Sequence, residues 1–178
     1  MKYNSGMRIV KQVTDYRFIN LKEVSDPNMG VKGYQFAERK GVDSVAFLCY
    51  HKDTQKFLIN KEATPPIGKF LFRAFGGSID KDKDYEEIVR DEVLEEAGYK
   101  VDPSKIKKVG RSFVSTQMNQ YCYLYVVFVS DKQKTKRRPE NPCEALAEPT
   151  WMSEEEIKKG DDWKAITIIE KAKLLDLI

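Results

Sequence analysis

The chain has 178 residues, of which 41% are hydrophobic and 33% are charged, with a formal net charge of +3. These values are ordinary for a soluble globular domain that is large enough to bury a core. They exclude a membrane-spanning protein, because no apolar run approaches the roughly 20 residues that a transmembrane helix needs. A net charge this small is no argument for nucleic-acid binding by itself.

The cysteines and the N-terminus indicate a reducing location. The three cysteines are Cys49, Cys122 and Cys143, and none of them forms a CxxC pair. An odd number without such pairs argues against a disulfide framework or a zinc site. The N-terminus also lacks the apolar core of a secretory signal. We therefore expect a cytoplasmic protein with no membrane partner.

The first half of the chain is predicted to form strands and turns. Runs rich in β-branched and aromatic residues favour strands. These runs are Met7–Thr14, Tyr16–Val24, Tyr34–Arg39, Val42–Tyr50, Lys56–Asn60 and Phe70–Phe75. The paired prolines within Ala63–Lys69 exclude a helix or a central strand, so a loop is expected there.

A single helix, Tyr85–Ala97, is predicted in the middle of the chain. Apolar residues recur there every four positions, as on the buried stripe of an amphipathic helix. Asp84 and Glu87 match a capping box at its start, and Gly98 matches a C-terminal stop.

The second half is predicted to add strands and then helices. The strands are Lys107–Ser115, Tyr121–Val129 and one within Ala145–Trp151, and the helices are Ser153–Gly160 and Asp162–Leu177. Strands on both sides of a central helix indicate an α+β fold, in which helices cover a mixed sheet.

The central helix carries a group of carboxylates that suits a metal ion. Glu92 and Glu96 lie four residues apart, on one helix face, and Glu95 lies beside them. Hard cations such as magnesium prefer clusters of this kind. A solvated acidic face is the alternative, but the flanking glycines favour a metal site. Gly77 allows a tight turn and a close backbone approach, and Gly98 ends the helix.

At these residues the chain resembles the Nudix hydrolase family, whose box reads G-x5-E-x7-R-E-U-x-E-E-x-G-U, with U a bulky aliphatic residue. The matching residues are Gly77, Glu92, Val93, Glu95, Glu96 and Gly98, with the aromatic Tyr99 at the last position. Lys83 replaces the first glutamate of the box, and Asp91 replaces its arginine. In the family these two positions are implied to pair, and a Lys–Asp pair of reversed sign can still bridge the same gap.

The resemblance implies a fold, a cofactor and roles for individual residues. The fold is an α/β/α sandwich with a mixed sheet, formed by residues 41–178. Glu92, Glu95 and Glu96 would hold Mg²⁺, or Mn²⁺ in its place, and activate a water molecule for attack on a diphosphate. Glu95 and Glu96 would thus take part in catalysis. Glu144 and Glu148 are the candidates for a further catalytic carboxylate, with a surface loop as the alternative.

The region before the box is similar to the ADP-ribose pyrophosphatase branch. That resemblance implies an ADP-ribose or nucleotide-sugar substrate and a homodimer formed through a strand-rich N-terminal extension, residues 1–40. Members of the branch usually carry a glutamate ligand where this chain has Arg73. Arg73 can instead contact a substrate phosphate or pair with the acidic helix, and Gly77 is the second candidate for substrate contact.

Two other functions stay open. Five cations lie in the seven positions from Lys132 to Arg138. They can attract an RNA backbone, as in removal of a nucleotide cap, or they can belong to a solvated loop. The departures at Lys83, Asp91 and Arg73 leave room for a nucleotide sensor with weak catalysis.

Overall fold

The computed structural model describes residue 7 and residues 9–16, 18–39, 43–79 and 82–178. The remaining residues lie outside this description, and with them lie parts of the predicted N-terminal strands, the start of Val42–Tyr50 and two residues of the box loop. None of the described helices is long and apolar enough to cross a bilayer. The chain divides into two compact units. Unit 1 comprises Met1–Asp43 and Ser112–Cys122, and unit 2 comprises Ser44–Arg111 and Tyr123–Ile178.

Unit 1 is built on a three-stranded antiparallel sheet. Its strands are β1 (Ile9–Gln12), β2 (Ile19–Asp26) and β3 (Val31–Arg39), in the order β1-β2-β3. The turn between β2 and β3 contains the short 3₁₀ helix η1 (Pro27–Met29). Asp26 caps η1 by accepting the Asn28 N–H, and Gly30 ends it at φ 67°. Such a positive φ suits glycine, which has no Cβ.

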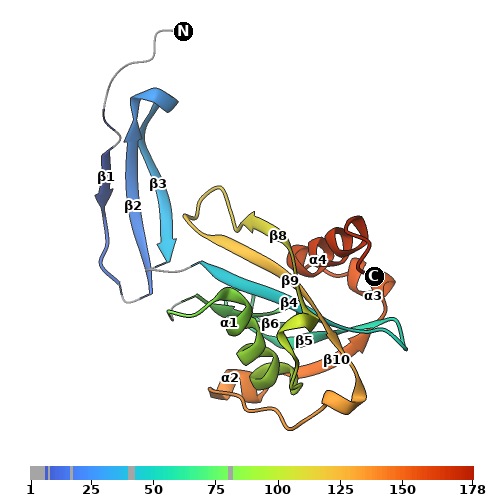
Figure 1. Ribbon diagram of the computed structural model, residues 1–178. Helices are drawn as coiled ribbons and strands as arrows, with labels where there is room; N and C mark the ends of the chain where they lie inside the picture. Colours follow the sequence, from blue (N-terminus) through green and yellow to red (C-terminus); the bar gives the residue numbers. More distant parts are fainter. Residues whose placement is uncertain (1–6, 8, 17, 40–42, 80–81) are drawn as a thin grey trace. The chain divides into compact units, whose positions relative to one another are not determined.

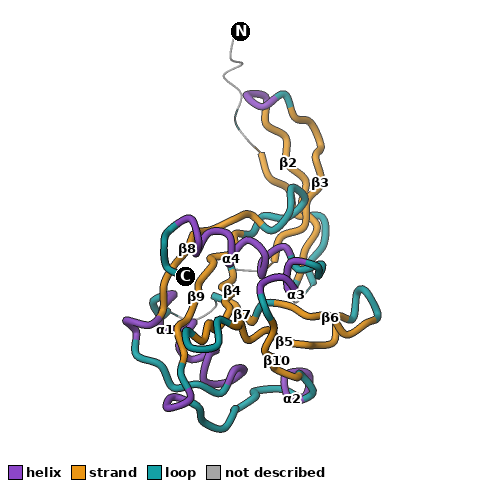
Figure 2. The backbone as a smooth tube through the Cα atoms, turned by 90° about the vertical axis from the view of Figure 1, so that its right-hand side faces the viewer, coloured by secondary structure: helices purple, strands orange, loops and turns teal. Residues whose placement is uncertain are grey.

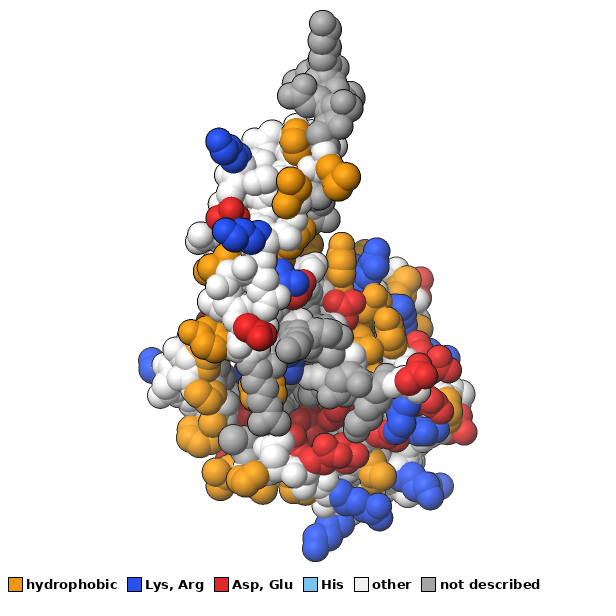
Figure 3. Space-filling model, turned by 90° about the vertical axis from the view of Figure 1, so that its left-hand side faces the viewer, with side chains coloured by type: hydrophobic (Ala, Val, Ile, Leu, Met, Phe, Trp, Pro, Cys, Tyr) orange, Lys and Arg blue, Asp and Glu red, His pale blue; other side chains and the backbone are white. Residues whose placement is uncertain are grey.

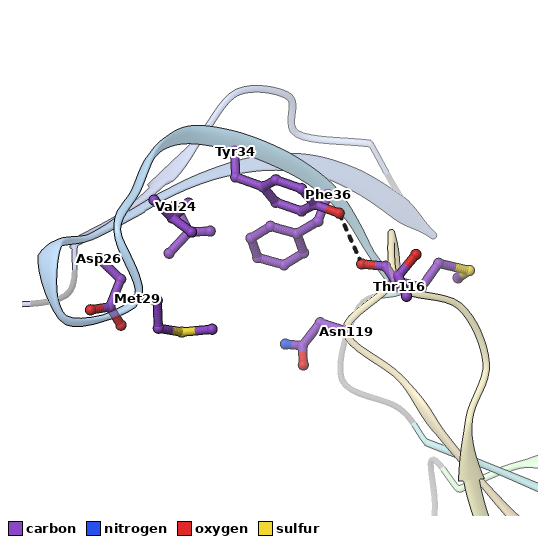
Figure 4. Close-up of a pocket in the computed structure, with 9 residues that line it drawn as sticks. Val24, Asp26, Met29, Tyr34, Phe36, Thr116 and Asn119 are labelled. Atoms are coloured by element: carbon purple, nitrogen blue, oxygen red, sulfur yellow. Dashed lines mark hydrogen bonds between the residues drawn. The ribbon is translucent and has the colours of Figure 1, made fainter.

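The 112–122 segment packs against β3. The Ala37 N–H donates to the Gln117 carbonyl at 2.7 Å, and the Asn119 N–H donates to the Ala37 carbonyl at 3.0 Å. Figure 4 shows the pocket that results, with a volume of about 380 Å³. Tyr34 and Phe36 line it from β3, and the Tyr34 hydroxyl donates to the Thr116 carbonyl at 3.1 Å.

Unit 2 contains most of a seven-stranded mixed sheet. Its path runs β10-β5-β4-β9-β8, with β6 paired to β5 and β7 paired to β4. The strands are β4 (Ser44–His51), β5 (Lys56–Thr64), β6 (Lys69–Arg73), β7 (Phe75–Ser78), β8 (Ile106–Phe113), β9 (Tyr121–Val129) and β10 (Glu148–Met152). Figure 2 shows β6, β5 and β10 side by side, in agreement with their antiparallel pairing.

Helices cover both faces of this sheet (Figure 1). They are α1 (Tyr85–Glu92) with its π-helical continuation η2 (Val93–Ala97), α2 (Pro142–Ala145), α3 (Glu154–Lys158) and α4 (Trp163–Leu174). Two short 3₁₀ helices, η3 (Pro103–Lys105) and η4 (Asp131–Gln133), complete the elements. Successive side chains of a strand point to opposite faces. Accordingly, Phe47 of β4 joins the core cluster that contains Val89 and Val93, while Leu48 is buried on the other face, where α4 contacts β4. The predicted α+β fold is confirmed.

Three local expectations differ from the structure. The Asp84 side chain makes no capping bond, and its backbone carbonyl accepts the N–H groups of Glu87 and Ile88 instead, so the predicted capping box is wrong. The strand predicted over Phe70–Phe75 is interrupted at Ala74, whose N–H donates to the Asp162 carboxylate at 2.6 Å. The predicted loop Ala63–Lys69 is shortened to a hairpin turn, because β5 extends to Thr64 and β6 begins at Lys69.

Candidate functional site

Gly77 and Glu92 lie in direct contact. Gly77 is on β7, opposite Val45 of β4, and Glu92 is the last residue of α1. A Cβ atom placed on Gly77 would lie 2.1 Å from Glu92 Oε1 and 2.6 Å from Glu92 Cδ. The absence of a side chain at Gly77 therefore lets the carboxylate of Glu92 sit against the strand.

Gly77→Ala should lower turnover about 10- to 100-fold, the range typical of residues that support metal ligands. The added methyl group displaces the flexible Glu92 side chain, so the free energy of unfolding should change little. Gly76→Ala is the matched contrast. Its Cβ would lie 2.6 Å from the Val45 backbone carbonyl, which cannot rotate away, so that variant should be destabilised. Thermal unfolding and initial rates on both variants check this; a fully active Gly77→Ala would contradict it.

Glu96 is a buried carboxylate surrounded by others. Its side chain is 6% exposed, and its Oε2 accepts the Gly76 N–H at 3.4 Å. Burial is the main cause that raises the pKa of the Glu96 carboxyl to about 8. Three nearby carboxylates raise it too, namely Glu92, Glu62 and Glu144, while the Gly76 N–H opposes them. Such a site favours the arrival of positive charge.

The carboxylates of Glu92, Glu95 and Glu96 are suitable ligands for a hard cation, although they do not converge on one point. Carboxylate oxygens are the ligands that magnesium and manganese accept. Among the described residues, no three His, Cys, Asp or Glu side chains form a ready metal-holding group. Acidic side chains nevertheless gather on one face of the molecule, with Lys and Arg side chains near its lower edge (Figure 3). Side-chain rotation at Glu92, Glu95 and Glu96 would be needed to close a site around a cation.

The reversed pair of the box is present as an ion pair. Lys83 Nζ lies 2.7 Å from Asp91 Oδ2, within hydrogen-bonding distance. This bond, together with the negative charge of Asp91, raises the pKa of the Lys83 ammonium. The expected attraction across the loop is thereby confirmed. The loop is bound to the helix even though the signs of both residues are exchanged.

Lys83→Glu and Asp91→Arg should each destabilise the protein, and the double variant should recover. Either single change places like charges together, whereas the double change restores an attractive pair. The pair is solvent-exposed and screened by water, so the expected coupling is small but favourable. Unfolding of all four proteins in urea measures it as a double-mutant cycle. Strictly additive effects would show that the two side chains do not interact.

The two candidate carboxylates outside the helix lie in different settings. Glu144 is on α2, where its carboxylate accepts the Glu140 N–H at 2.7 Å and the Asn141 side-chain amide, and its charge acts on Glu96. Glu148 opens β10; its side chain is 71% exposed and lies 3.5 Å from Lys61 Nζ. The structure thus brings Glu144 within electrostatic reach of Glu96, and it gives Glu148 a surface ion pair.

Arg73 binds a strand neighbour and not the acidic helix. Its Nη1 lies 2.6 Å from Glu62 Oε1, on the adjacent strand β5. Of the two expectations for Arg73, pairing with the helix is therefore wrong. Neither Glu62 nor its second partner, Asn60, was predicted from the sequence. The only signal for them is the pair of polar residues two positions apart in a strand, at positions that share one face of the sheet.

The basic segment from Lys132 to Arg138 is fixed to the fold along its length. The Thr135 N–H donates to the Gly98 carbonyl at 2.8 Å, and the Arg138 N–H donates to the Glu95 carbonyl at 3.0 Å. The Arg137 guanidinium donates to the carbonyls of Glu144 and Ala147, both at 2.8 Å. Arg137 therefore holds the turn that carries Glu144. The side chains of Lys134, Lys136 and Arg138 are exposed.

Comparison with known proteins shows the fold and the family of the chain. The comparison with curated proteins found no match. A solved structure described as an ADP compounds hydrolase shares the fold with a TM-score of 0.71 and 10% sequence identity, covering 96% of this chain and 95% of its own. A family model, the NUDIX domain, matches residues 42–171, which include the glutamates of α1 and η2. This match spans most of the chain, and the chain therefore belongs to the Nudix hydrolase family.

Proposed function

We propose that the protein is a magnesium-dependent hydrolase that cleaves the diphosphate bond of a nucleoside diphosphate derivative, with ADP-ribose or a nucleotide sugar as the substrate. The observation that carries this proposal is the buried Glu96 carboxylate, which lies beside Gly76 and is acted on by three further carboxylates. Nudix hydrolases generally use divalent metal ions. The ADP compounds hydrolase, whose fold this chain shares, supports the substrate class.

Each residue of the site has a role in this proposal. Glu92, Glu95 and Glu96 would hold Mg²⁺, which supplies charge neutralisation of the diphosphate and a water of lowered pKa. Gly77 keeps the strand backbone close to Glu92. Arg73 would bind a phosphate oxygen, as guanidinium groups do well. Glu144 is the better placed of the two candidates for proton transfer, because its charge acts on Glu96.

A substrate panel tests the proposal. The purified protein is incubated with ADP-ribose, nucleotide sugars, dinucleoside polyphosphates and nucleoside triphosphates, with Mg²⁺, with Mn²⁺ or with EDTA. Mass spectrometry then identifies the phosphate-containing products. Cleavage of ADP-ribose to AMP and ribose phosphate, dependent on the metal, is the expected result. No cleavage of any compound with either metal would overturn the proposal and leave a binding protein.

Removal of a nucleotide cap from RNA is the second candidate, and the exposed row Lys134, Lys136 and Arg138 favours it. The row is fixed at its end to the carbonyl of Glu95, so RNA held there would lie near the acidic helix. If this function is correct, RNA affinity should fall steeply with added salt, with a slope that becomes shallower when the three cations are replaced by Gln. Binding titrations at several salt concentrations measure this slope. A salt-independent affinity would exclude the function.

The N-terminal extension, residues 1–40, supports a homodimer in this proposal. Large apolar side chains of unit 1 are exposed, including Ile9, Tyr16 and Ile19. The buried free cysteine Cys49 fits a reducing, cytoplasmic location. Light scattering of the purified chain, with and without residues 1–40, measures the oligomeric state.

A further inference from the structure

Three polar side chains form a row across the strands next to the acidic site. Asn60 and Glu62 lie two residues apart on β5, on the same sheet face as Leu58, which packs in the core cluster beneath α1 and η2. The register of β5 and β6 pairs Asn60 directly with Arg73. All three side chains therefore belong to the sheet face that carries the acidic helix.

Both oxygens of Glu62 are engaged within this row. Oε1 lies 2.6 Å from Arg73 Nη1, and Oε2 accepts the Asn60 side-chain amide at 3.1 Å. Asn60 is completely buried, whereas the Arg73 side chain is 34% exposed. Asn60 thus fixes Glu62 from the interior, and Glu62 fixes one edge of a guanidinium that reaches solvent. The remaining N–H groups of that guanidinium are suited to an anion.

The burial of Asn60 lowers the stability of the fold, which is unexpected for a residue with a purely structural role. Its Oδ1 atom is buried and has no hydrogen-bond donor among the described residues. A buried acceptor without a partner lowers stability, and an apolar side chain of similar size avoids that cost. The three residues that precede Asn60 on the strand, Phe57, Leu58 and Ile59, are apolar and buried. The amide at position 60 therefore needs an explanation other than packing, and its bond to Glu62 provides one.

The row also lies at the acidic site. The charge of Glu62 acts on the carboxyl of Glu96, which places the row within electrostatic reach of the glutamate face. Arg73 ends β6, and the chain passes through Ala74 directly into β7, which carries Gly76 and Gly77. Arg73 is thus three residues from Gly76, whose N–H donates to the Glu96 carboxylate.

We propose that Asn60 and Glu62 are positioning residues that hold the Arg73 guanidinium in place to bind the diphosphate oxygens of the substrate. This proposal rests on the proposed function for the identity of the substrate. It adds that orientation of Arg73 is transmitted from the core through Asn60 and Glu62. Arg73 contacts the anion, and the other two residues act only through it. An Arg73 side chain without them would keep its charge and lose its fixed direction.

The test compares Asn60→Leu, Glu62→Gln and Arg73→Lys with Lys69→Gln, an exposed change on the same strand as Arg73. Binding of inorganic pyrophosphate in the presence of Mg²⁺ is measured by calorimetry, and kcat and KM are measured with the best substrate of the panel. We expect Asn60→Leu to weaken pyrophosphate binding and raise KM by about 10- to 100-fold, with a smaller change in kcat. Its melting temperature should stay the same or rise, and Lys69→Gln should resemble the unchanged protein.

The double variant Asn60→Leu/Arg73→Lys separates positioning from packing. If Asn60 acts through Arg73, the double variant binds pyrophosphate no more weakly than Arg73→Lys alone. Additive losses, or an unchanged pyrophosphate affinity in both Asn60→Leu and Glu62→Gln, would overturn the inference. If Asn60→Leu does not fold, Glu62→Gln in place of it decides the same question. A protein that cleaves nothing and still binds pyrophosphate through Arg73 would refute the hydrolase proposal alone.

Discussion

Glu96→Gln should remove most turnover, by about two to three orders of magnitude, while the protein stays folded. Losses of this size follow when one group that stabilises charge at the reacting centre is deleted. The glutamine side chain of this variant has nearly the same shape as the native one, and its oxygen can still accept the Gly76 N–H, so packing is preserved. It lacks the negative charge with which the carboxylate would bind and neutralise a metal ion. Initial rates with saturating Mg²⁺, together with circular dichroism, measure both parts of this expectation.

A matched control separates the site from a general effect of charge. Glu155→Gln makes the same chemical change at an exposed position in the first turn of α3. That variant should keep full activity. A metal titration adds the second readout, because Glu96→Gln should need more Mg²⁺ or Mn²⁺ for half-maximal rate. Full activity of Glu96→Gln at ordinary metal concentrations would remove Glu96 from the metal site.

The elements of unit 2 could be predicted from the sequence because their signals are local. The four-residue period from Tyr85 to Ala97 placed the central helix, and the spacing from Gly77 to Tyr99 led to the family. The continuation of that helix as a π-helix over Val93–Ala97 has no such local signal. Within it the carbonyl of Glu95 accepts the Arg138 N–H, a contact from a distant part of the chain that no local pattern predicts.

The electrostatics of the site were harder to predict, because they depend on cross-strand register. Asn60 and Arg73 are 13 positions apart and become neighbours only through the β5–β6 hairpin. The paired prolines predicted a long loop, and the hairpin was therefore not expected. In the structure β5 continues to Thr64 and β6 begins at Lys69, so only a short turn separates them. Helix capping at Asp84 failed for a related reason. A sequence pattern permits a side-chain cap, and the final rotamer depends on the surroundings.

The metal-free protein should lose stability as the pH rises from about 4.5 to about 8. The Glu96 carboxyl has its ordinary pKa near 4.5 in the unfolded chain and a pKa of about 8 in the folded protein. Between these values the folded state binds more protons than the unfolded state, so each rise in pH favours unfolding. The stability contributed by the neutral carboxyl is complete below pH 4.5 and is lost on approach to pH 8. Its expected size is on the order of a few kcal/mol.

Glu96→Gln isolates this effect, because the other titrating groups are common to both proteins. In EDTA the variant should have a flatter dependence of its unfolding free energy on pH, and at pH 8 it should be more stable than the unchanged protein. Saturating Mg²⁺ should stabilise the unchanged protein more at pH 8 than at pH 5, since a metal ligand must be ionised and binding releases the proton. Urea unfolding at several pH values gives both curves. If the two proteins have parallel curves in EDTA, the pKa of Glu96 is not raised in the folded protein. Burial and the nearby carboxylates of Glu92, Glu62 and Glu144 would then not affect its titration. A different outcome is that the two curves differ in EDTA and still differ in saturating Mg²⁺. The pKa of Glu96 would then be raised as expected, but the cation would bind elsewhere.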